Sequence, residues 1–357
     1  IELLEILIDG ITGSHRFFSK YFNPSFYNFL IASFEILALL VLISVILFWT
    51  RRNIVKIKRF LSNEMKGWPK FDADNILYFE IVLMLLFLSM NATDLILQER
   101  NFEGYYKAGS FPVSSLMVPL FDSFTTSTVY VFERVFWWLH IIGIFFFLNY
   151  LYYSKHLHIL LAFPNTYFAN LESKGKFGIL ESVKNEVLLM FYPEKASESN
   201  SEIDKFGASD VLDLNWVQLM NAYSCTECGR CTSECPANLT GKKLSPRKIM
   251  MDTRDRLEKV SKNITINKGK FIDDGDRLLD NYISKEELWA CTSCNACVEA
   301  CPINIDPLSI IMDMRQFLIM EESSAHPDLN NMMNNIENNG APWPYNQQDR
   351  ELWIQEA

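Results

Sequence analysis

Eight cysteines carry the most specific chemistry in this chain, and they occur in two runs of identical spacing. Cys225–Cys235 and Cys291–Cys301 both read C-x2-C-x2-C-x3-C, and a proline follows each run. Thiolates at this spacing ligate [4Fe–4S] cubanes, because three of them can wrap one corner of a cubane from a single tight loop. The proline fixes the backbone at a position that needs no donated hydrogen bond. The two runs therefore predict two [4Fe–4S] clusters.

The fourth cysteine of such a run ligates the other cluster, so we assign the eight thiols crosswise. Structural zinc is the main alternative, but it uses one or two CxxC pairs rather than two complete copies of the longer run. Disulfides are disfavoured in a cytoplasmic domain. These runs use all eight cysteines, which predicts an electron relay with substrate chemistry on another chain. One cluster is assigned Cys225, Cys228, Cys231 and Cys301, and the other Cys291, Cys294, Cys297 and Cys235.

Three apolar segments precede the cysteines, and each is long enough to span a bilayer, which needs about 20 residues. They cover residues 29–49, 76–97 and 128–153. Core helices of a soluble protein are the alternative, which three such runs disfavour. Residues 1–8 are also apolar and resemble the tail of a further helix, so we expect the sequence to be truncated at its N-terminus.

Basic residues mark one side of the predicted membrane bundle. Five Lys and Arg residues lie within 51–59, directly after the first span, and Lys155 follows the third. Because Lys and Arg favour the cytoplasmic side, we expect an inner (cytoplasmic) membrane, multi-pass protein in contact with lipid, with the iron–sulfur domain in the cytoplasm. The net charge of −10 and the lack of a concentrated basic face argue against a nucleic-acid partner.

The expected fold is therefore all-α, with a transmembrane helical bundle (three full spans plus the end of another) followed by a helical two-[4Fe–4S] domain. The transmembrane part covers 1–165 and a polar connector covers 166–210, of which 194–204 reads as an exposed loop. The two-cluster domain covers 211–320, and 321–357 is an extended tail that is a possible docking segment for a partner.

Two histidines near the third span are candidate haem ligands, since a buried histidine in a membrane helix is costly and is a functional candidate by default. His140 and His158 are 18 residues apart, which is about 5 turns and about 27 Å on a continuous helix. Both would then share one face and suit two stacked haems b; a histidine bonded to a neighbouring helix is the alternative. His15 falls in a predicted outer loop, where a surface position is expected.

Five charged residues lie inside or at the edges of the spans. We expect ordinary structural pairings for four of them, whereas Arg134 could pair with a haem propionate or with its neighbour Glu133. The five residues are Glu35, Glu80, Asp94, Glu133 and Arg134.

The chain resembles two known families in its two halves. Its cysteine runs, separated by 55 residues, resemble the helical ferredoxin domain of succinate dehydrogenase iron–sulfur subunits and heterodisulfide reductase subunits. Its membrane part resembles the gamma subunit of membrane-bound nitrate reductase, a dihaem quinol oxidase. That resemblance implies that His140 and His158 each ligate one haem b, with the opposite ligands before residue 1. The whole is similar to a fused heterodisulfide-reductase-like protein, and 342–353 resembles a segment that precedes cysteine-rich reductase domains in relatives.

These features predict a membrane-bound electron-transfer subunit of a quinone-linked oxidoreductase. It would exchange electrons with quinone or quinol, through one or two haems b and two [4Fe–4S] clusters, and with a cytoplasmic cysteine-rich reductase or other redox subunit. A second hypothesis is a non-haem membrane anchor that tethers a ferredoxin-type relay. A third, regulatory iron–sulfur sensing, would need an output domain that we do not find in the sequence.

Overall fold

The computed structural model describes residues 2–173, 176, 178, 181–194, 205–344 and 346–355. These residues form helices and loops, with one isolated β-bridge between Leu279 and Ile283. The prediction of an all-α fold is confirmed. The chain divides into two compact units, Ile1–Leu157 and His158–Ala357. Most of the loop predicted at 194–204 lies outside the described residues.

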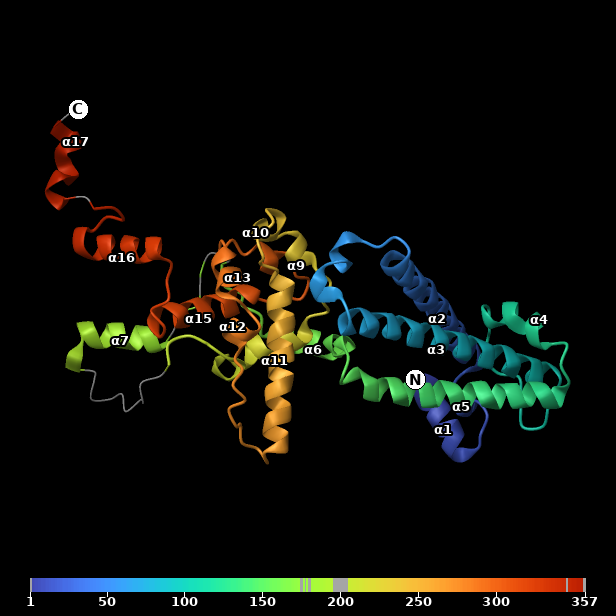
Figure 1. Cartoon of the computed structure of the whole chain (residues 1–357). Coiled ribbons are helices and arrows are strands. Elements are labelled where there is room, and N and C mark those ends of the chain that lie inside the picture. The colour runs from blue at the N-terminus through green and yellow to red at the C-terminus, as the bar shows by residue number, and fades with distance from the viewer. Residues whose placement is uncertain are drawn as a thin grey trace. The chain divides into compact units, whose positions relative to one another are not determined.

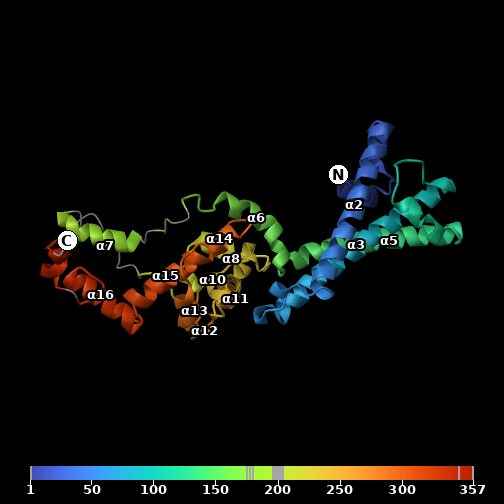
Figure 2. The ribbon, with the colours of Figure 1, turned by 90° about the horizontal axis from the view of Figure 1, so that it is seen from above.

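The first unit contains three helices that are long and apolar enough to cross a membrane. They are α2 (Pro24–Asn53), α3 (Trp68–Glu99) and α5 (Thr126–Leu151), and α3 lies between the other two (Figures 1 and 2). The two spans predicted at 29–49 and 76–97 fall wholly inside α2 and α3. Shorter elements complete this unit: α1 (Glu2–Thr12), η1 (Phe17–Lys20), η2 (Lys58–Phe60), η3 (Asn63–Met65), η4 (Ser114–Met117), α4 (Val118–Phe121) and η5 (Lys155–Leu157).

Capping and burial explain how these long helices form. The Asn23 side chain accepts a hydrogen bond from the backbone of Ser25, and Pro24 occupies the first turn of α2, where its missing N–H costs nothing. A single stripe of α2 is buried against its neighbours, while the remaining apolar face is exposed, as a lipid-facing helix requires. The buried stripe is Tyr27, Ile31, Glu35, Ala38 and Val45.

The third long helix ends at Leu151, so the continuous helix predicted from His140 to His158 is wrong. The Lys155 backbone N–H donates to Asp72 at 3.0 Å, and its ammonium donates to the Pro69 carbonyl at 2.6 Å. These contacts with the start of α3 hold a turn that the apolar sequence gives no sign of. A new helix then begins at His158, and the same-face argument for the two histidines no longer applies.

The second unit contains one long helix, α11, with shorter helices beside it (Figure 1). Its apolar core includes side chains from both sides of the interval between the two cysteine runs. Its helices are α6 (His158–Tyr167), α7 (Glu181–Phe191), η7 (Val211–Asp213), α8 (Trp216–Ser224), α9 (Arg230–Ser233), α10 (Pro236–Leu239), α11 (Pro246–Ile266), α12 (Leu278–Asn281), α13 (Lys285–Ala290), α14 (Ala296–Glu299), α15 (Pro307–Met320), α16 (Pro327–Asn339), η8 (Gln347–Glu351) and α17 (Leu352–Gln355).

Arg256, in the middle of α11, holds the chain between the two cysteine runs in place. Its side chain is fully buried. It donates to Asp210 at 2.6 Å and to Asp274 at 2.7 Å, while Asp210 also accepts from the backbone N–H of Leu278 at 3.0 Å. Three segments distant in sequence are therefore joined through one guanidinium, which brings the second run back beside the first.

Replacing Arg256 by methionine should destabilise this unit by about 3 kcal/mol, because the carboxylates of Asp210 and Asp274 then lose their buried partner. Arg277→Ala is the matched control: Arg277 pairs with Asp280 and Glu322, but its side chain is 38% exposed, so the loss should stay under about 1 kcal/mol. Urea unfolding of the full chain, followed through the visible absorbance of its clusters, measures both. Equal effects of the two substitutions would contradict this role for Arg256.

Candidate iron–sulfur site and membrane histidines

The two cysteine runs fold into loops of the same conformation. In each loop, the residue before the second cysteine and the residue after it have positive φ angles. The angles are 58° at Glu227 and 74° at Gly229, against 55° at Ser293 and 61° at Asn295. Such angles are rare outside glycine. Their repetition at matching positions shows that the loop geometry, and not only the cysteine spacing, is duplicated.

Matching hydrogen bonds accompany the matching angles. The Glu227 backbone N–H donates to the Cys225 sulfur at 3.4 Å, and the Ser293 N–H donates to the Cys291 sulfur at 3.4 Å. A sulfur that accepts from a backbone N–H is favoured in its charged form. In the first thiol of each loop this bond opposes burial, which remains the larger influence and raises the pKa of both thiols.

A capped helix leads into each loop. α8 ends at Ser224 and α13 ends at Ala290, immediately before the first cysteine of its run. Both helices begin with a reciprocal capping box, which satisfies two of the unpaired N–H groups at a helix start. The boxes pair Asn215 with Gln218 and Ser284 with Glu287.

A cavity of about 210 Å³ opens between the loops. The four thiols assigned to the first cluster all line it, which means that Cys301 of the second run lies beside the first run. Cys297 reaches the same cavity. His158, Arg230 and Arg247 also line this cavity.

The other four thiols also approach one another across the two runs. The charge of Cys235 contributes to the raised pKa of both Cys291 and Cys297, after burial as the main cause. Cys235 therefore lies near the second run, as the crosswise assignment expects. Cys294, in contrast, is exposed, so this group of thiols reaches the surface of the unit.

The thiols fit a positively charged iron cluster. Burial, and then the charge of neighbouring thiolates, raises the pKa of Cys225, Cys231 and Cys297 to about 12. Crowded thiolates repel one another unless a metal compensates their charge. Within the described residues, no three His, Cys, Asp or Glu side chains are arranged to hold a single metal ion. A cubane spreads its ligands over four irons, so its thiols lie farther apart than those around one zinc ion.

His158 is part of the thiol cavity of the second unit. It begins α6, which packs against α8, and Asn165 at the other end of α6 is buried and donates to the Ile303 carbonyl at 2.8 Å. The imidazole thus lies in the wall of the first group of thiols. Its predicted role as a haem ligand stays a prediction, and sequence spacing alone gave no sign of this position.

His140 is buried in the membrane unit, and its Nδ1 lies 3.1 Å from the Leu83 carbonyl. Metal-bound histidines usually donate their second ring N–H to such a group. The same bond is also what a purely structural histidine would make, so the haem role of His140 stays a prediction as well.

The charges inside the spans find local partners, as expected. Glu35 accepts from the backbone N–H groups of Val113 and Ser114 at 2.9 and 3.1 Å. Glu80 lies 3.8 Å from His156, and Asp94 lies 2.8 Å from Arg16. Arg134 pairs with Glu133, and its guanidinium lies 5.5 Å above the Trp137 ring.

The expectation of a surface position for His15 is wrong. Its Nε2 lies 2.8 Å from Asp94, and its side chain is only 12% exposed. The loop folds back over the end of the bundle because Asp9 accepts from the backbone N–H groups of Arg16 and Phe17. A histidine beside an arginine, with an acidic residue in a later span, was the one sequence signal that could have indicated this contact.

Comparison with known proteins supports the iron–sulfur assignment. A family model described as a 4Fe-4S dicluster domain matches residues 224–305. A probable iron–sulfur-binding oxidoreductase, FadF of Bacillus subtilis, is 29% identical over 351 residues, which are 90% of this chain and 46% of that protein. The EtfAB:quinone oxidoreductase of Syntrophomonas wolfei is 25% identical over 376 residues, which are 99% of this chain and 49% of that protein.

The chain therefore spans about half the length of these curated relatives. A protein of Archaeoglobus profundus that is itself named for its likeness to a heterodisulfide reductase subunit is 26% identical over 141 residues, covering 40% of this chain and 61% of that protein. No solved structure matches significantly. The chain is thus an iron–sulfur protein similar to oxidoreductases and to the iron–sulfur subunits of heterodisulfide reductases. Likeness to the nitrate reductase gamma subunit stays a prediction.

Crosswise ligation predicts which single cysteine substitutions disturb the same cluster. Cys235→Ser should disturb the same cluster as Cys291→Ser, while Cys301→Ser should match Cys225→Ser. Each variant should fall from about eight irons per chain to about four. Iron analysis and EPR spectra of the dithionite-reduced protein measure this. The assignment fails if Cys235→Ser reproduces the spectrum of Cys225→Ser.

His158→Leu should lower the potential of one cluster, because a polar group in the wall of the cavity favours the more negative reduced state. We expect the midpoint potential of that cluster to fall by about 60 mV, which is ~1.4 kcal/mol for a one-electron couple. The iron content should not change. His156→Leu, outside this cavity wall, is the control. A redox titration followed by EPR measures the shift; loss of a haem b absorbance band in His158→Leu would instead assign this histidine to haem.

Proposed function

We propose that this chain is a membrane-bound electron-transfer subunit of a quinone-linked oxidoreductase, which passes electrons between the quinone pool and a redox partner through two [4Fe–4S] clusters. The observation that carries the proposal is the pair of matching thiol loops in a unit that directly follows three helices of membrane-spanning length. The quinone is supported by the similarity to an EtfAB:quinone oxidoreductase along nearly the whole chain.

The thiols suggest an order for the relay. His158, the first residue after the membrane unit, is in the wall of the first cavity, so the chain leads directly from the spans to the first group of thiols. Cys294 of the second group is exposed. A bound [4Fe–4S] cluster would accept and release one electron at a time. Electrons would enter beside His158 and leave beside Cys294, or follow the reverse route.

The proposed partner is a cysteine-rich reductase or another redox subunit in the cytoplasm. The C-terminal tail offers a surface for docking, because its helices bury little. α16 has no buried residue, and Trp343 and Trp353 are exposed. Exposed tryptophans are typical anchors of protein interfaces.

Haem b is the proposed carrier within the membrane unit. His140 is buried, and its bond to the Leu83 carbonyl would leave Nε2 available for iron. Arg134 and His158 are the further candidates, the first for a propionate and the second for a haem nearer the cytoplasm. A non-haem anchor is the alternative function, in which these residues have only structural roles.

The basic residues support an orientation in the inner membrane. Arg52 pairs with Asp74 at 3.3 Å, and Lys155 donates to the Pro69 carbonyl, so the end of α2, the start of α3 and the chain after α5 meet at one end of the bundle. We propose that this basic end faces the cytoplasm. The opposite end, with α1 and the loop around His15, then faces outward.

A quinol should reduce the clusters of the intact protein. In anaerobic nanodiscs, menadiol added to the air-oxidised chain should produce the EPR signal of reduced clusters, with a haem b absorbance band if haem is present. Cys228→Ser should lose part of that signal. Dithionite reduction without any response to menadiol would contradict the quinone link, and absence of the haem band would favour the anchor hypothesis.

A further inference from the structure

A polar cavity of about 400 Å³ lies at the end of the membrane unit opposite the basic end. It is formed where the loop after α1 meets the end of α3 and the start of α5. We call it the His15 cavity. Its polar walls include Glu5, Asp9, His15, Arg16, Asp94, Glu103, Glu133 and Arg134, and its apolar and aromatic walls include Ile6, Met90, Phe102, Tyr105, Tyr130 and Trp137.

The imidazole of His15 is held in one orientation. Its Nε2 lies 2.8 Å from one oxygen of Asp94, and Arg16 donates to the other oxygen from Nε at 3.1 Å and Nη2 at 2.8 Å. The ring also packs against Tyr105, with centroids 4.5 Å apart. Its second nitrogen, Nδ1, is buried and has no hydrogen-bond partner among the residues that the structure describes.

This arrangement determines which nitrogen accepts. Asp94 is engaged by a guanidinium and is therefore a carboxylate, which can only accept hydrogen bonds. In the neutral ring Nε2 then carries the proton, and Nδ1 presents a lone pair. A buried acceptor without a partner costs about 1–3 kcal/mol. A ligand that donates a hydrogen bond to Nδ1 would recover that loss.

The charges of the cavity disfavour an ionic ligand. Five carboxylates line it against two guanidiniums, so an anion would be repelled. The carboxylates that face inward already have partners: Asp94 is bound by Arg16 and Glu133 by Arg134, and Glu5 accepts from Tyr27 at 2.8 Å. A metal cation would have to displace these donors. A neutral ligand fits best.

The aromatic walls favour a flat ring. Tyr105 and Tyr130 meet edge to face with centroids 6.3 Å apart, and Met90 and Trp137 continue into the apolar core between the helices. A volume of this size is ordinary for a small-molecule site. The ligand class that combines a neutral flat ring, an apolar body and a donating hydroxyl is a hydroquinone.

We propose that the His15 cavity binds the headgroup of a hydroquinone, with one hydroxyl donating to Nδ1 of His15; this rests on the proposed quinone-linked function and locates its site. The site selects the reduced form, since a quinone carbonyl has no hydrogen to donate to that nitrogen. His15 is the recognition residue, and Asp94 positions it.

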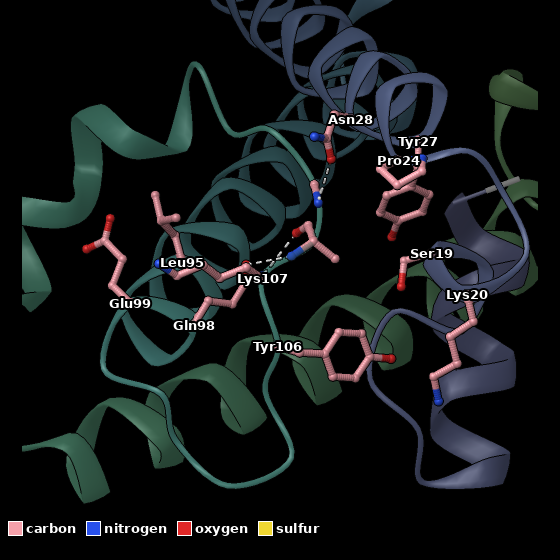
Figure 3. Close-up of a pocket in the computed structure, with 12 residues that line it drawn as sticks. Ser19, Lys20, Pro24, Tyr27, Asn28, Leu95, Gln98, Glu99, Tyr106 and Lys107 are labelled. Carbon is pink, nitrogen blue, oxygen red and sulfur yellow. Dashed lines mark hydrogen bonds between the residues drawn. The ribbon is translucent and has the colours of Figure 1, made fainter.

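The Asp94 network continues into a neighbouring cavity of about 550 Å³ (Figure 3). Gln98 donates to Asp94 at 3.2 Å and also lines this second cavity. Tyr106, which donates to the His15 carbonyl, points there toward Lys20 (Figure 3). Polar groups therefore lead from the His15–Asp94 pair into the second cavity.

The test compares duroquinol with its dimethyl ether, which has the same ring but no hydroxyl to donate. Binding of both to the full chain in nanodiscs is measured by equilibrium dialysis. Wild type should bind duroquinol about tenfold more tightly than the ether, the equivalent of one hydrogen bond. His15→Leu should abolish this preference, whereas His15→Gln, whose amide can bind Asp94 and still present an oxygen, should keep part of it.

His326→Leu, on the exposed tail, is the control and should behave as wild type. Iron content and the dithionite-reduced EPR spectrum of each variant establish that it is folded. If His15→Leu retains the wild-type preference, or if wild type shows none, the proposal is overturned. Cluster reduction by menadiol in wild type is a separate result: its failure removes the quinone-linked function, while its success together with unchanged binding in His15→Leu removes this site alone.

Discussion

The electrostatics of eight crowded thiols govern this structure. Burial and mutual charge raise the pKa of several of them to about 12, so the ionised form that binds iron is disfavoured until a metal compensates its charge. Backbone hydrogen bonds to sulfur lower part of the free-energy cost of ionising these thiols. In both loops a backbone N–H is directed at the first sulfur, and the residues on either side of the second cysteine have positive φ angles. The apolar core of the second unit, built from residues before, between and after the two runs, brings two such loops together.

The need to bring the two thiol loops together explains the long interval between the cysteine runs. The chain runs away from the first loop along α11. Arg256 of this helix then binds both Asp210, before the first run, and Asp274, on the way to the second run. α6 adds a wall, with Asn165 bonded to the backbone after Cys301 and His158 in the cavity itself. The helix that follows the membrane unit in the sequence is therefore part of the cluster site.

The membrane unit shows the complementary constraint, since a charge in an apolar bundle must find partners inside the protein. Its polar groups gather at the two ends. At the basic end, Asp72 and the Pro69 carbonyl of α3 accept hydrogen bonds from Lys155. At the other end, Asp94 holds Arg16 and His15 over a cavity with an aromatic wall. The chain leaves the first end toward the iron–sulfur unit, while the other end combines a hydrogen-bond acceptor with space for a ligand.

Local pattern by itself determined the helical class, the three apolar spans and the two cysteine runs, because length, hydropathy and ligand spacing are short-range properties. It also predicts a crosswise grouping of the thiols, which stays a prediction; Cys301 lines a cavity with the first run, and Cys235 lies close enough to Cys291 to influence its pKa. Tertiary contacts decided the rest. The third span stops at Leu151 because Asp72, some 80 residues earlier, captures the next turn, and this moves His158 from the face of His140 to the thiols. His15 became buried because Asp94 lies opposite it. Such long-range pairings leave no periodic trace in the sequence.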